Sequence, residues 1–372
     1  MKITGWASLN EFLAECVVYR NLQPADPALP GFTELAAKAG LPPGLLPRKT
    51  EPDYARLIGT LLDAVQSQRG VARPLARLLY LGDTRLLDGS AFSNLCLAGG
   101  WPGLAFIGSE NSQPVSIEIE GALYLSNRWS ALFDFSDYAA RLGLPIDETT
   151  AVVVDIDKTA LGARGRNGQV IDQARVQAVY DTVAAMLGGA FDPEGFQVAY
   201  NLLNQPEFHP LTADNQDYLA YICLILGSGL VSLDAVVADY HSGRLKSFAQ
   251  FINGMQRRSN QLSADLEAIH GEIFANVQNG DPTPFKAFRR NEYIRTIACF
   301  GCLGENEPLE AYLNQEILIT EEVRRAALAW QQQGALLFGL SDKPDEAATP
   351  TVELAAQGYQ PIHRARTHAL SE

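Results

Sequence analysis

Val152-Val153-Val154-Asp155-Ile156-Asp157-Lys158-Thr159 is a β-branched run followed by two carboxylates that are one residue apart. The apolar run begins at Ala151 and predicts a buried strand. Because side chains alternate along a strand, Asp155 and Asp157 would point to one side and could approach one ligand. One carboxylate could then attack a phosphorus atom while the other moves a proton. The alternative is a strand end whose aspartates only cap the next helix.

A second apolar run, Leu78-Leu79-Tyr80-Leu81, ends at Gly82-Asp83, with Asp88 five residues further on. Gly82 permits a tight backbone and the close approach of a ligand. Hard cations such as Mg²⁺ bind one or two carboxylates together with water and phosphate oxygens. Asp83 fits that role, and Asp88 could be a second ligand or could orient the first. A plain turn with Asp88 at a helix N-cap is the alternative.

A third apolar run, Ala335 to Leu340, is followed by Ser341-Asp342-Lys343-Pro344. A hydroxyl at a strand end can donate a hydrogen bond to a phosphate oxygen, and Lys343 can add positive charge. A turn built around Pro344 is again the alternative. Since ligands of open α/β sheets bind at the carboxyl ends of the strands, three such ends are more informative together than singly.

The rest of the chain favours an α/β fold with a parallel sheet and a mainly helical segment. Leu104 to Ile107 is a further strand run, Gly89 to Ala98 has helical spacing, and residues 115–124 alternate as in an edge hairpin. Residues 165–315 are mostly helical, with a buried helix at Tyr218 to Leu226.

The C-terminal region returns to α/β character. Thr320 is a candidate N-cap for a helix that runs to Gln333. A helix at 351–357, a short strand at 359–363 and a frayed tail at 364–372 are expected.

Composition limits the function classes. Hydrophobic residues make up 47% of the 372 residues and charged residues 19%, the balance of a globular enzyme. A net charge of −14 argues against a nucleic-acid partner. No apolar stretch is long enough to span a membrane, no secretory leader is evident, and five cysteines are an odd number. These features predict a cytoplasmic protein with reduced thiols.

Together, the three strand ends resemble the motifs of the haloacid dehalogenase (HAD) superfamily. Its first motif, Asp-x-Asp-x-Thr after an apolar strand, is matched by Asp155 to Thr159. Its second, a strand-ending Ser or Thr often in a Ser/Thr-Asn/Asp-Lys-Pro turn, is matched by Ser341 to Pro344. Its fourth, an acidic pair, is matched by Asp83 and Asp88. Its third is a lone basic residue, for which Lys49 is the candidate and Lys343 the competitor.

The resemblance implies a Rossmann-like core with helices on both faces of the sheet and a Mg²⁺-dependent phosphatase acting on a small phosphorylated substrate. Asp155 would attack the phosphorus, and Asp157 would protonate the leaving alcohol and then activate water. Mg²⁺ would be held by Asp155, Asp83 and the backbone carbonyl of Asp157, with Asp88 as a further candidate. The phosphoryl oxygens would be bound by Lys49 and by Thr159, Ser341, Asp342 and Lys343.

The motifs occur in a rotated order, three, four, one and two, which a circular permutation explains because termini often lie close together. The expected HAD-like core is residues 1–160 and 318–372. Residues 161–317 lie where the family inserts a helical C1-type cap, which excludes water and contacts the substrate.

Several questions stay open in the sequence. Arg164 and Arg166 follow the first motif and could belong to a substrate loop or be structural. The mixed basic and aromatic stretch 285–293 is expected to be a solvated helix face. A phosphotransferase or phosphomutase on the same site, and a catalytically silent binding protein, are the competing functions. Neither the substrate nor the oligomeric state is indicated.

Overall fold

The computed structural model describes residues 1–42 and 46–372. The chain divides into two compact units. The first, called here the α/β unit, comprises Met1–Ala174 and Thr296–Glu372, and the second, the helical unit, comprises Arg175–Arg295. Each unit has its own buried apolar core. Within the described residues, no helix is long and apolar enough to cross a membrane.

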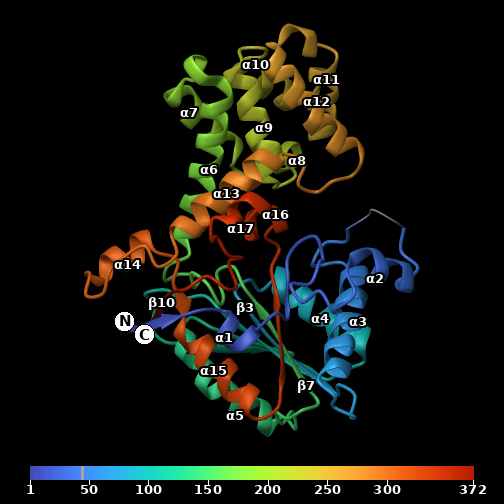
Figure 1. Ribbon diagram of the computed structural model, residues 1–372, viewed down its shortest axis with the longest axis vertical. Coiled ribbons are helices and arrows are strands. Elements are labelled where there is room, and N and C mark those ends of the chain that lie inside the picture. Colours follow the sequence, from blue (N-terminus) through green and yellow to red (C-terminus); the bar gives the residue numbers. More distant parts are fainter. Residues whose placement is uncertain (43–45) are drawn as a thin grey trace. The chain divides into compact units, whose positions relative to one another are not determined.

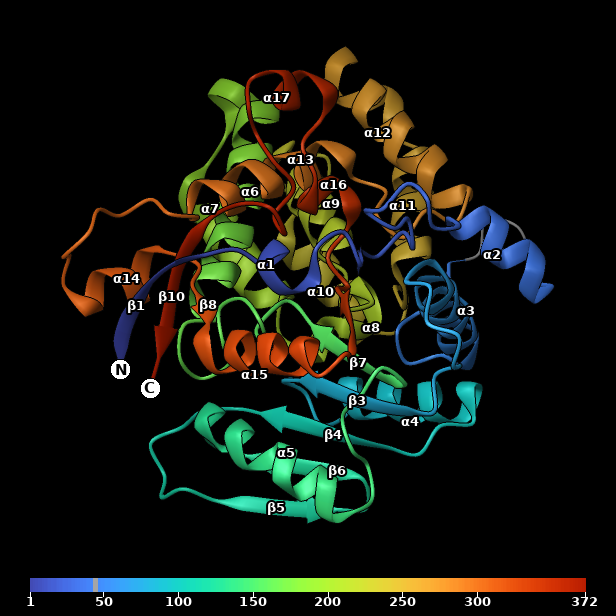
Figure 2. The same ribbon diagram turned by 60° about the horizontal axis from the view of Figure 1, so that its bottom comes forward.

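The α/β unit is built on a seven-stranded sheet with the order β2-β9-β7-β3-β4-β6-β5. All neighbouring strands are parallel except β5 and β6, which form an antiparallel pair (Figure 2). This confirms the mostly parallel sheet and the edge hairpin expected from the sequence. The strands are β2 (Val17–Val18), β3 (Arg77–Gly82), β4 (Gly103–Gly108), β5 (Ile117–Glu120), β6 (Leu123–Ser126), β7 (Thr150–Asp155) and β9 (Leu336–Leu340).

Helices cover both faces of this sheet (Figure 1). Leu78 and Tyr80 of β3 pack in one core with the helices α2 (Phe32–Ala39), α3 (Pro52–Gln68) and α4 (Leu87–Gly99). The opposite face carries α1 (Asn10–Leu13), α5 (Leu132–Arg141) and α15 (Glu321–Gln332). There Phe106 and Trp330 lie against Phe135. Burial on both faces explains why the central strands are continuously apolar instead of alternating.

The register of the central strands brings their carboxyl ends to one edge. Val154 of β7 is level with Leu81 of β3, and Asp155 is level with Leu340 of β9. The residues that follow β3 and β9 in the chain, Asp83 and Ser341, therefore lie on either side of the end of β7. The three strand ends noted in the sequence thus meet at one edge of the sheet.

A second, three-stranded sheet corrects the prediction for the tail. β10 (Thr367–Ser371) pairs antiparallel with β1 (Lys2–Ala7) and parallel with β8 (Ile319–Thr320), so the expected fraying after 364 is wrong. Both chain ends lie together in Figure 2, with Lys2 opposite Ser371. The strand expected at 359–363 is also absent: residues 359–361 have no regular structure, and a turn follows at 362–364. The remaining helices of this unit are α14 (Leu309–Gln315), α16 (Asp345–Ala348) and α17 (Val352–Ala356).

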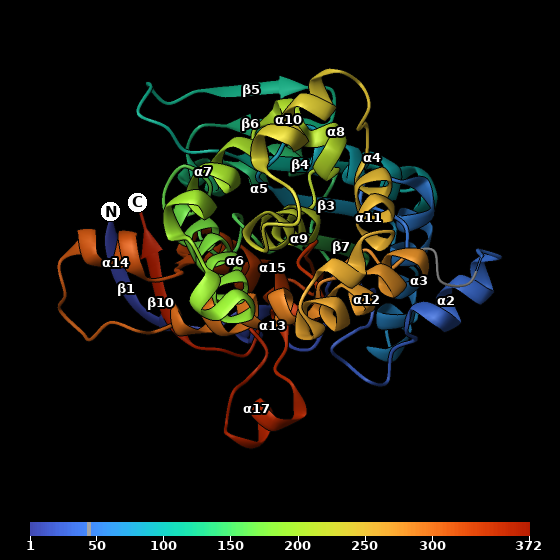
Figure 3. The same cartoon turned by 90° about the horizontal axis from the view of Figure 1, so that it is seen from above.

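The helical unit is organised around α9, which is buried over nearly all its length, as its apolar sequence predicts. Figure 3 shows α9 with α6 and α7 on one side and α11 and α12 on the other. Asn, Asp or Ser side chains cap the N-termini of α7, α9, α10, α11 and α12, which satisfies backbone N–H groups that a helix leaves free. The helices are α6 (Gln169–Leu187), α7 (Pro193–Leu203), α8 (His209–Thr212), α9 (Gln216–Gly227), α10 (Leu233–His241), α11 (Phe248–Gln256), α12 (Ala264–Gln278) and α13 (Lys286–Ala298).

A buried ion cluster joins α9 to α13. The Arg289 guanidinium donates to Asp217 Oδ2 at 2.8 Å through Nε and to Glu292 Oε2 at 2.6 Å through Nη1. Glu292 also accepts from Arg175 at 2.9 Å. Both carboxylates are fully buried and Arg289 is 7% exposed, so the solvated face expected for residues 285–293 is wrong at this position.

We expect Arg289→Met to destabilise the helical unit by about 3–5 kcal/mol, because it removes the cation that pairs with buried Asp217 and one of the two that pair with buried Glu292. Arg290→Met is the matched control, since Arg290 is the exposed neighbour and carries the same charge. Urea unfolding followed by circular dichroism measures both. Equal stability of the two variants would contradict a structural role for the cluster.

Candidate active site

Asp155 ends the central strand β7 as a buried carboxylate. It alternates with Ala151 and Val153, so its side chain points to the face covered by α3 and α4. Lys49, just before α3, donates to Asp155 Oδ1 at 2.5 Å, and the Thr159 hydroxyl donates to Oδ2 at 2.9 Å. These two contacts fix the carboxylate at the strand end and use one lone pair of each oxygen.

Asp88 organises the turn that follows β3. Its Oδ1 accepts from Lys49 Nζ at 2.7 Å and from the Tyr80 hydroxyl at 3.1 Å. Its Oδ2 accepts from the backbone N–H groups of Asp83 at 3.0 Å and Thr84 at 2.8 Å. A carboxylate offers about four lone-pair sites, so these four donors occupy all the capacity of Asp88.

Asp83 follows directly on β3 and is 7% exposed. Its Oδ1 accepts from the Thr84 hydroxyl at 2.9 Å, and its Oδ2 accepts from Arg164 Nε. Carboxylate oxygens of Asp83, Asp88 and Asp155 all lie within 4.8 Å of one another. This is a concentration of negative charge at the end of the central strands.

The environment shifts the protonation of these groups in both directions. Burial raises the pKa of Asp155 well above its usual range, and burial together with the charge of Asp88 raises the pKa of Asp83. Burial also opposes ionisation of Asp88, but Lys49 and the backbone donors lower the pKa of that carboxyl. Despite its burial, the neighbouring carboxylates raise the pKa of Lys49 well above its usual range. Lys49 is therefore a fixed positive charge among the carboxylates.

The turn after β7 carries Asp157. Lys158 adopts a left-handed conformation with φ 66°, and its N–H donates to Leu161 O at 2.7 Å. This tight turn leaves the Asp157 side chain 23% exposed, with Lys343 Nζ 3.9 Å from its Oδ2. Asp157 is thus more accessible than Asp155, whose side chain is 8% exposed.

The turn after β9 carries the remaining predicted residues. The Ser341 hydroxyl accepts from Lys343 N at 3.0 Å, so its own proton is still available for donation. Ser341 and Lys343 are buried, whereas Asp342 is exposed. The backbone is fixed because Ser341 N donates to Val18 O at 3.0 Å and Lys343 O accepts from Arg20 N at 3.0 Å.

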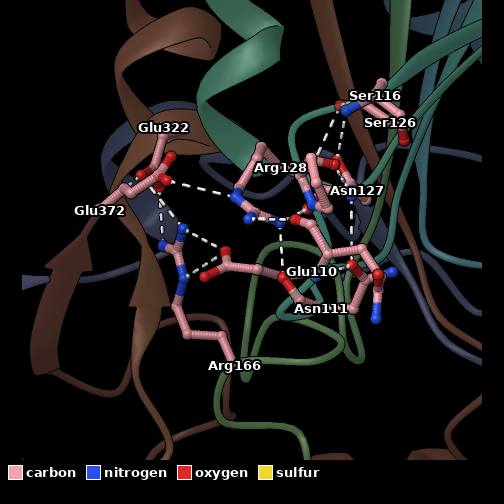
Figure 4. A network of polar contacts seen from close by, with 11 residues as sticks. Glu110, Asn111, Ser116, Ser126, Asn127, Arg128, Arg166, Glu322 and Glu372 are labelled. Atoms are coloured by element: carbon pink, nitrogen blue, oxygen red, sulfur yellow. Dashed lines mark hydrogen bonds and ion pairs between the residues drawn. The ribbon is translucent and has the colours of Figure 1, made fainter.

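A buried network anchors the loop between β7 and α6 (Figure 4). Arg166 lies between Glu110 and Glu322, with nitrogen–oxygen distances of 2.7 Å and 2.9 Å, and is almost completely buried. Glu322 also accepts from Glu372 N at 2.8 Å. Arg166 is therefore fully engaged in structural contacts, whereas Arg164, two residues earlier, contacts Asp83.

Contacts link Lys49, Asp83, Asp88, Asp155 and Thr159 into one cluster, and the strand register puts Ser341 beside it. Asp157 and Lys343 form a second pair in adjacent turns. Three contributors were not expected from the sequence: Tyr80, Thr84 and the Arg164 contact with Asp83. Of these, only Tyr80 could have been predicted from the sequence. It lies two residues before Gly82 on the same strand, and so it lies on the same face of the sheet as Gly82.

The donor set fits a hard divalent cation, since oxygen ligands from one or two carboxylates are what Mg²⁺ prefers. Asp155 and Asp83 each accept two hydrogen bonds and keep lone pairs for such an ion, whereas Asp88 does not. The backbone carbonyl of Asp157 is a candidate third ligand. Lys49 and Arg164 already pair with the three carboxylates, so the case for a metal ion rests on the lone pairs that Asp155 and Asp83 keep free.

Gly82→Ala tests the packing of this cluster. A Cβ on Gly82 would lie 2.6 Å from Asp88 Cβ and Cγ, so Asp88 must move. We expect a loss of about 1–3 kcal/mol of stability and a fall in any activity that depends on Lys49 and Asp83. Gly59→Ala in α3 is the control, because it meets no atom within 4 Å and replaces a helical glycine, which favours stability. Thermal unfolding of both variants is the measurement, and an equally stable Gly82→Ala protein would contradict the described packing.

A scan against protein-family models finds no match to this chain, and searches of curated proteins and of solved structures find none either.

Proposed function

We propose that the chain is a Mg²⁺-dependent phosphatase of the HAD type, with permuted motifs and Asp155 as its nucleophile. The observation that carries the proposal is the meeting of Asp155, Asp83 and Lys49 at one sheet edge. Lys49 and Asp155 are 106 residues apart in the chain and yet in direct contact. Each of these residues is a motif position on sequence grounds alone.

The topology supports the permuted order. The strand with the first motif, β7, lies between the strands that carry the second and fourth, β9 and β3. The pairing of β1 with β10 brings the chain ends together, which a circular permutation requires. Arg175–Arg295, the helical unit, lies between the first and second motifs in the sequence, where the family inserts its cap.

In the first step, an Asp155 carboxylate oxygen attacks the phosphorus of a phosphate monoester. The phosphorus–oxygen bond to the substrate alcohol breaks as the new bond forms, and Asp157 gives its proton to the leaving oxygen. The Thr159 hydroxyl and Lys49 hold the attacking carboxylate in place. The product of this step is an aspartyl phosphate at position 155.

In the second step, Asp157 takes a proton from a water molecule, whose oxygen attacks the phosphorus. The bond to Asp155 breaks, and inorganic phosphate and the free carboxylate are regenerated. Lys49 and Ser341 stabilise negative charge on the phosphoryl oxygens, and Lys343 Nζ lies 3.9 Å from Asp157 Oδ2. Asp88 acts indirectly by orienting Lys49 and the turn that carries Asp83.

Mg²⁺ bound by Asp155, Asp83 and the Asp157 carbonyl would neutralise the phosphoryl group and the attacking carboxylate. The exposed turn that includes Asp342 is a candidate contact for the rest of the substrate.

A screen of phosphorylated metabolites with and without Mg²⁺ tests the proposal, with Asp155→Asn as the control. We expect Mg²⁺-dependent release of inorganic phosphate from at least one compound by the wild type and none by the variant. Phosphate transfer to an added alcohol without release to water would instead indicate a phosphotransferase. No turnover together with no Mg²⁺ binding would leave a catalytically silent protein.

A further inference from the structure

Arg164 is the cation that contacts Asp83. Its Nε donates to Asp83 Oδ2, while the side chain remains 39% exposed and that of Asp83 only 6%. The guanidinium therefore lies at the boundary between the buried carboxylates and solvent. Only one of its donors is used by Asp83, and the fork of a guanidinium offers five.

The backbone of Arg164 is fixed even though its side chain is half exposed. Its N–H donates to Lys158 O at 2.8 Å, and its carbonyl accepts from Glu110 N at 3.0 Å and from Trp129 Nε1 at 3.3 Å. The buried Arg166 anchors the same loop. A change in the cluster can therefore move the Arg164 side chain without moving the loop.

Asp83 keeps lone pairs on which a divalent ion could bind, but the ion would then lie next to the positive guanidinium of Arg164. Two cations on one carboxylate repel each other, and a divalent ion held by Asp83 and Asp155 carries the larger charge. Once displaced, the guanidinium would still lie close to the cluster, because its backbone is held there. Its planar donor pairs match the oxygens of a phosphoryl group.

We propose that Arg164 is an exchange residue, which pairs with Asp83 in the cation-free protein and binds the phosphoryl group once Mg²⁺ has taken Asp83. This inference rests on the proposed function. It adds a residue that none of the motifs contains. It also makes substrate binding depend on prior metal binding, since Arg164 becomes free to bind phosphate only when the cation displaces it from Asp83.

Arg164→Gln tests both the pairing with Asp83 and the binding of the phosphoryl group. It should raise the affinity for Mg²⁺ and lower the affinity for phosphate. Titration calorimetry with MgCl₂ should give tighter binding than in the wild type, on the order of tenfold, since a competing positive charge has been removed. Inorganic phosphate titrated into the Mg²⁺-saturated variant should bind about tenfold more weakly, because a charge-assisted ligand is lost. Arg164→Lys should retain the wild-type Mg²⁺ affinity and part of the phosphate affinity.

Arg73→Gln is the charge-matched control, since Arg73 pairs with Glu148 at an exposed site and should leave both affinities unchanged. Circular dichroism establishes that each variant is folded. If the wild type binds Mg²⁺ but Arg164→Gln binds it no more tightly, or if phosphate affinity is unchanged, the exchange role is wrong while the proposed function stands. If the wild type binds no Mg²⁺ at millimolar concentration, the proposed function itself fails.

Discussion

Asp155→Asn is expected to abolish phosphatase activity, with kcat lowered on the order of 10⁴-fold or more, because the nucleophile is removed outright. The amide keeps the shape of the carboxyl group. Its oxygen can still accept from Lys49, and its NH2 group can donate to the Thr159 hydroxyl oxygen in place of the bond that Thr159 donates now. Burial already disfavours the charged form of Asp155, so the folded state should tolerate the neutral side chain. Steady-state phosphate release, with thermal unfolding as the check on folding, measures the effect.

Asp157→Asn is the contrasting variant, since it removes the proton donor and base but not the nucleophile. With p-nitrophenyl phosphate, whose leaving group needs little protonation, we expect a burst of nitrophenol followed by slow turnover. Asp155→Asn should give no burst. Substantial steady-state activity in a folded Asp155→Asn protein would assign the chemistry to another group.

Lys49→Met is expected to have the second largest effect, on both activity and stability. Lys49 is the common partner of Asp155 and Asp88, so its loss leaves two buried carboxylates without a cation, which costs about 3–5 kcal/mol. Activity should fall on the order of 10²- to 10³-fold, because a fixed charge beside the phosphoryl group is lost. Equilibrium unfolding and phosphate release are the two readouts.

Lys343→Met is the comparison that decides between the two candidate lysines. Lys343 is equally buried, but its Nζ lies 3.9 Å from Asp157 Oδ2, whereas Lys49 contacts Asp155. If Lys49 is the third-motif residue, Lys343→Met should lower activity less than Lys49→Met does. A larger loss in Lys343→Met would transfer that role to Lys343.

The sheet could be predicted because its central strands carry their own signal. Ala151–Val154, Leu78–Leu81 and Leu336–Leu340 are continuously apolar, which is the pattern of parallel strands buried on both faces. β2 and β10 have no comparable signal. β2 spans two residues, and β10 is stabilised by its pairing with β1 at the other end of the chain.

The strand pattern of the sequence predicts only those site residues that directly follow a recognisable strand. Asp83, Asp155 and Ser341 follow apolar runs, and parallel strands bring such positions to one edge. Turn conformations and loop paths decide the rest. Two of the four donors on Asp88 depend on how residues 83 and 84 turn, and the contact of Arg164 with Asp83 bridges 81 residues. Arg289 shows the same limit, because its partner Asp217 is 72 residues away.

Trapping of the covalent intermediate tests the central claim most directly. The enzyme is mixed with Mg²⁺ and a substrate from the screen, quenched, and reduced with borohydride, which converts an aspartyl phosphate to homoserine. Peptide mass spectrometry then locates the modified residue. We predict homoserine at position 155 in the wild type, at a higher level in Asp157→Asn and nowhere in Asp155→Asn. Turnover of the substrate with an unmodified Asp155, or with homoserine at another aspartate, would contradict the assignment.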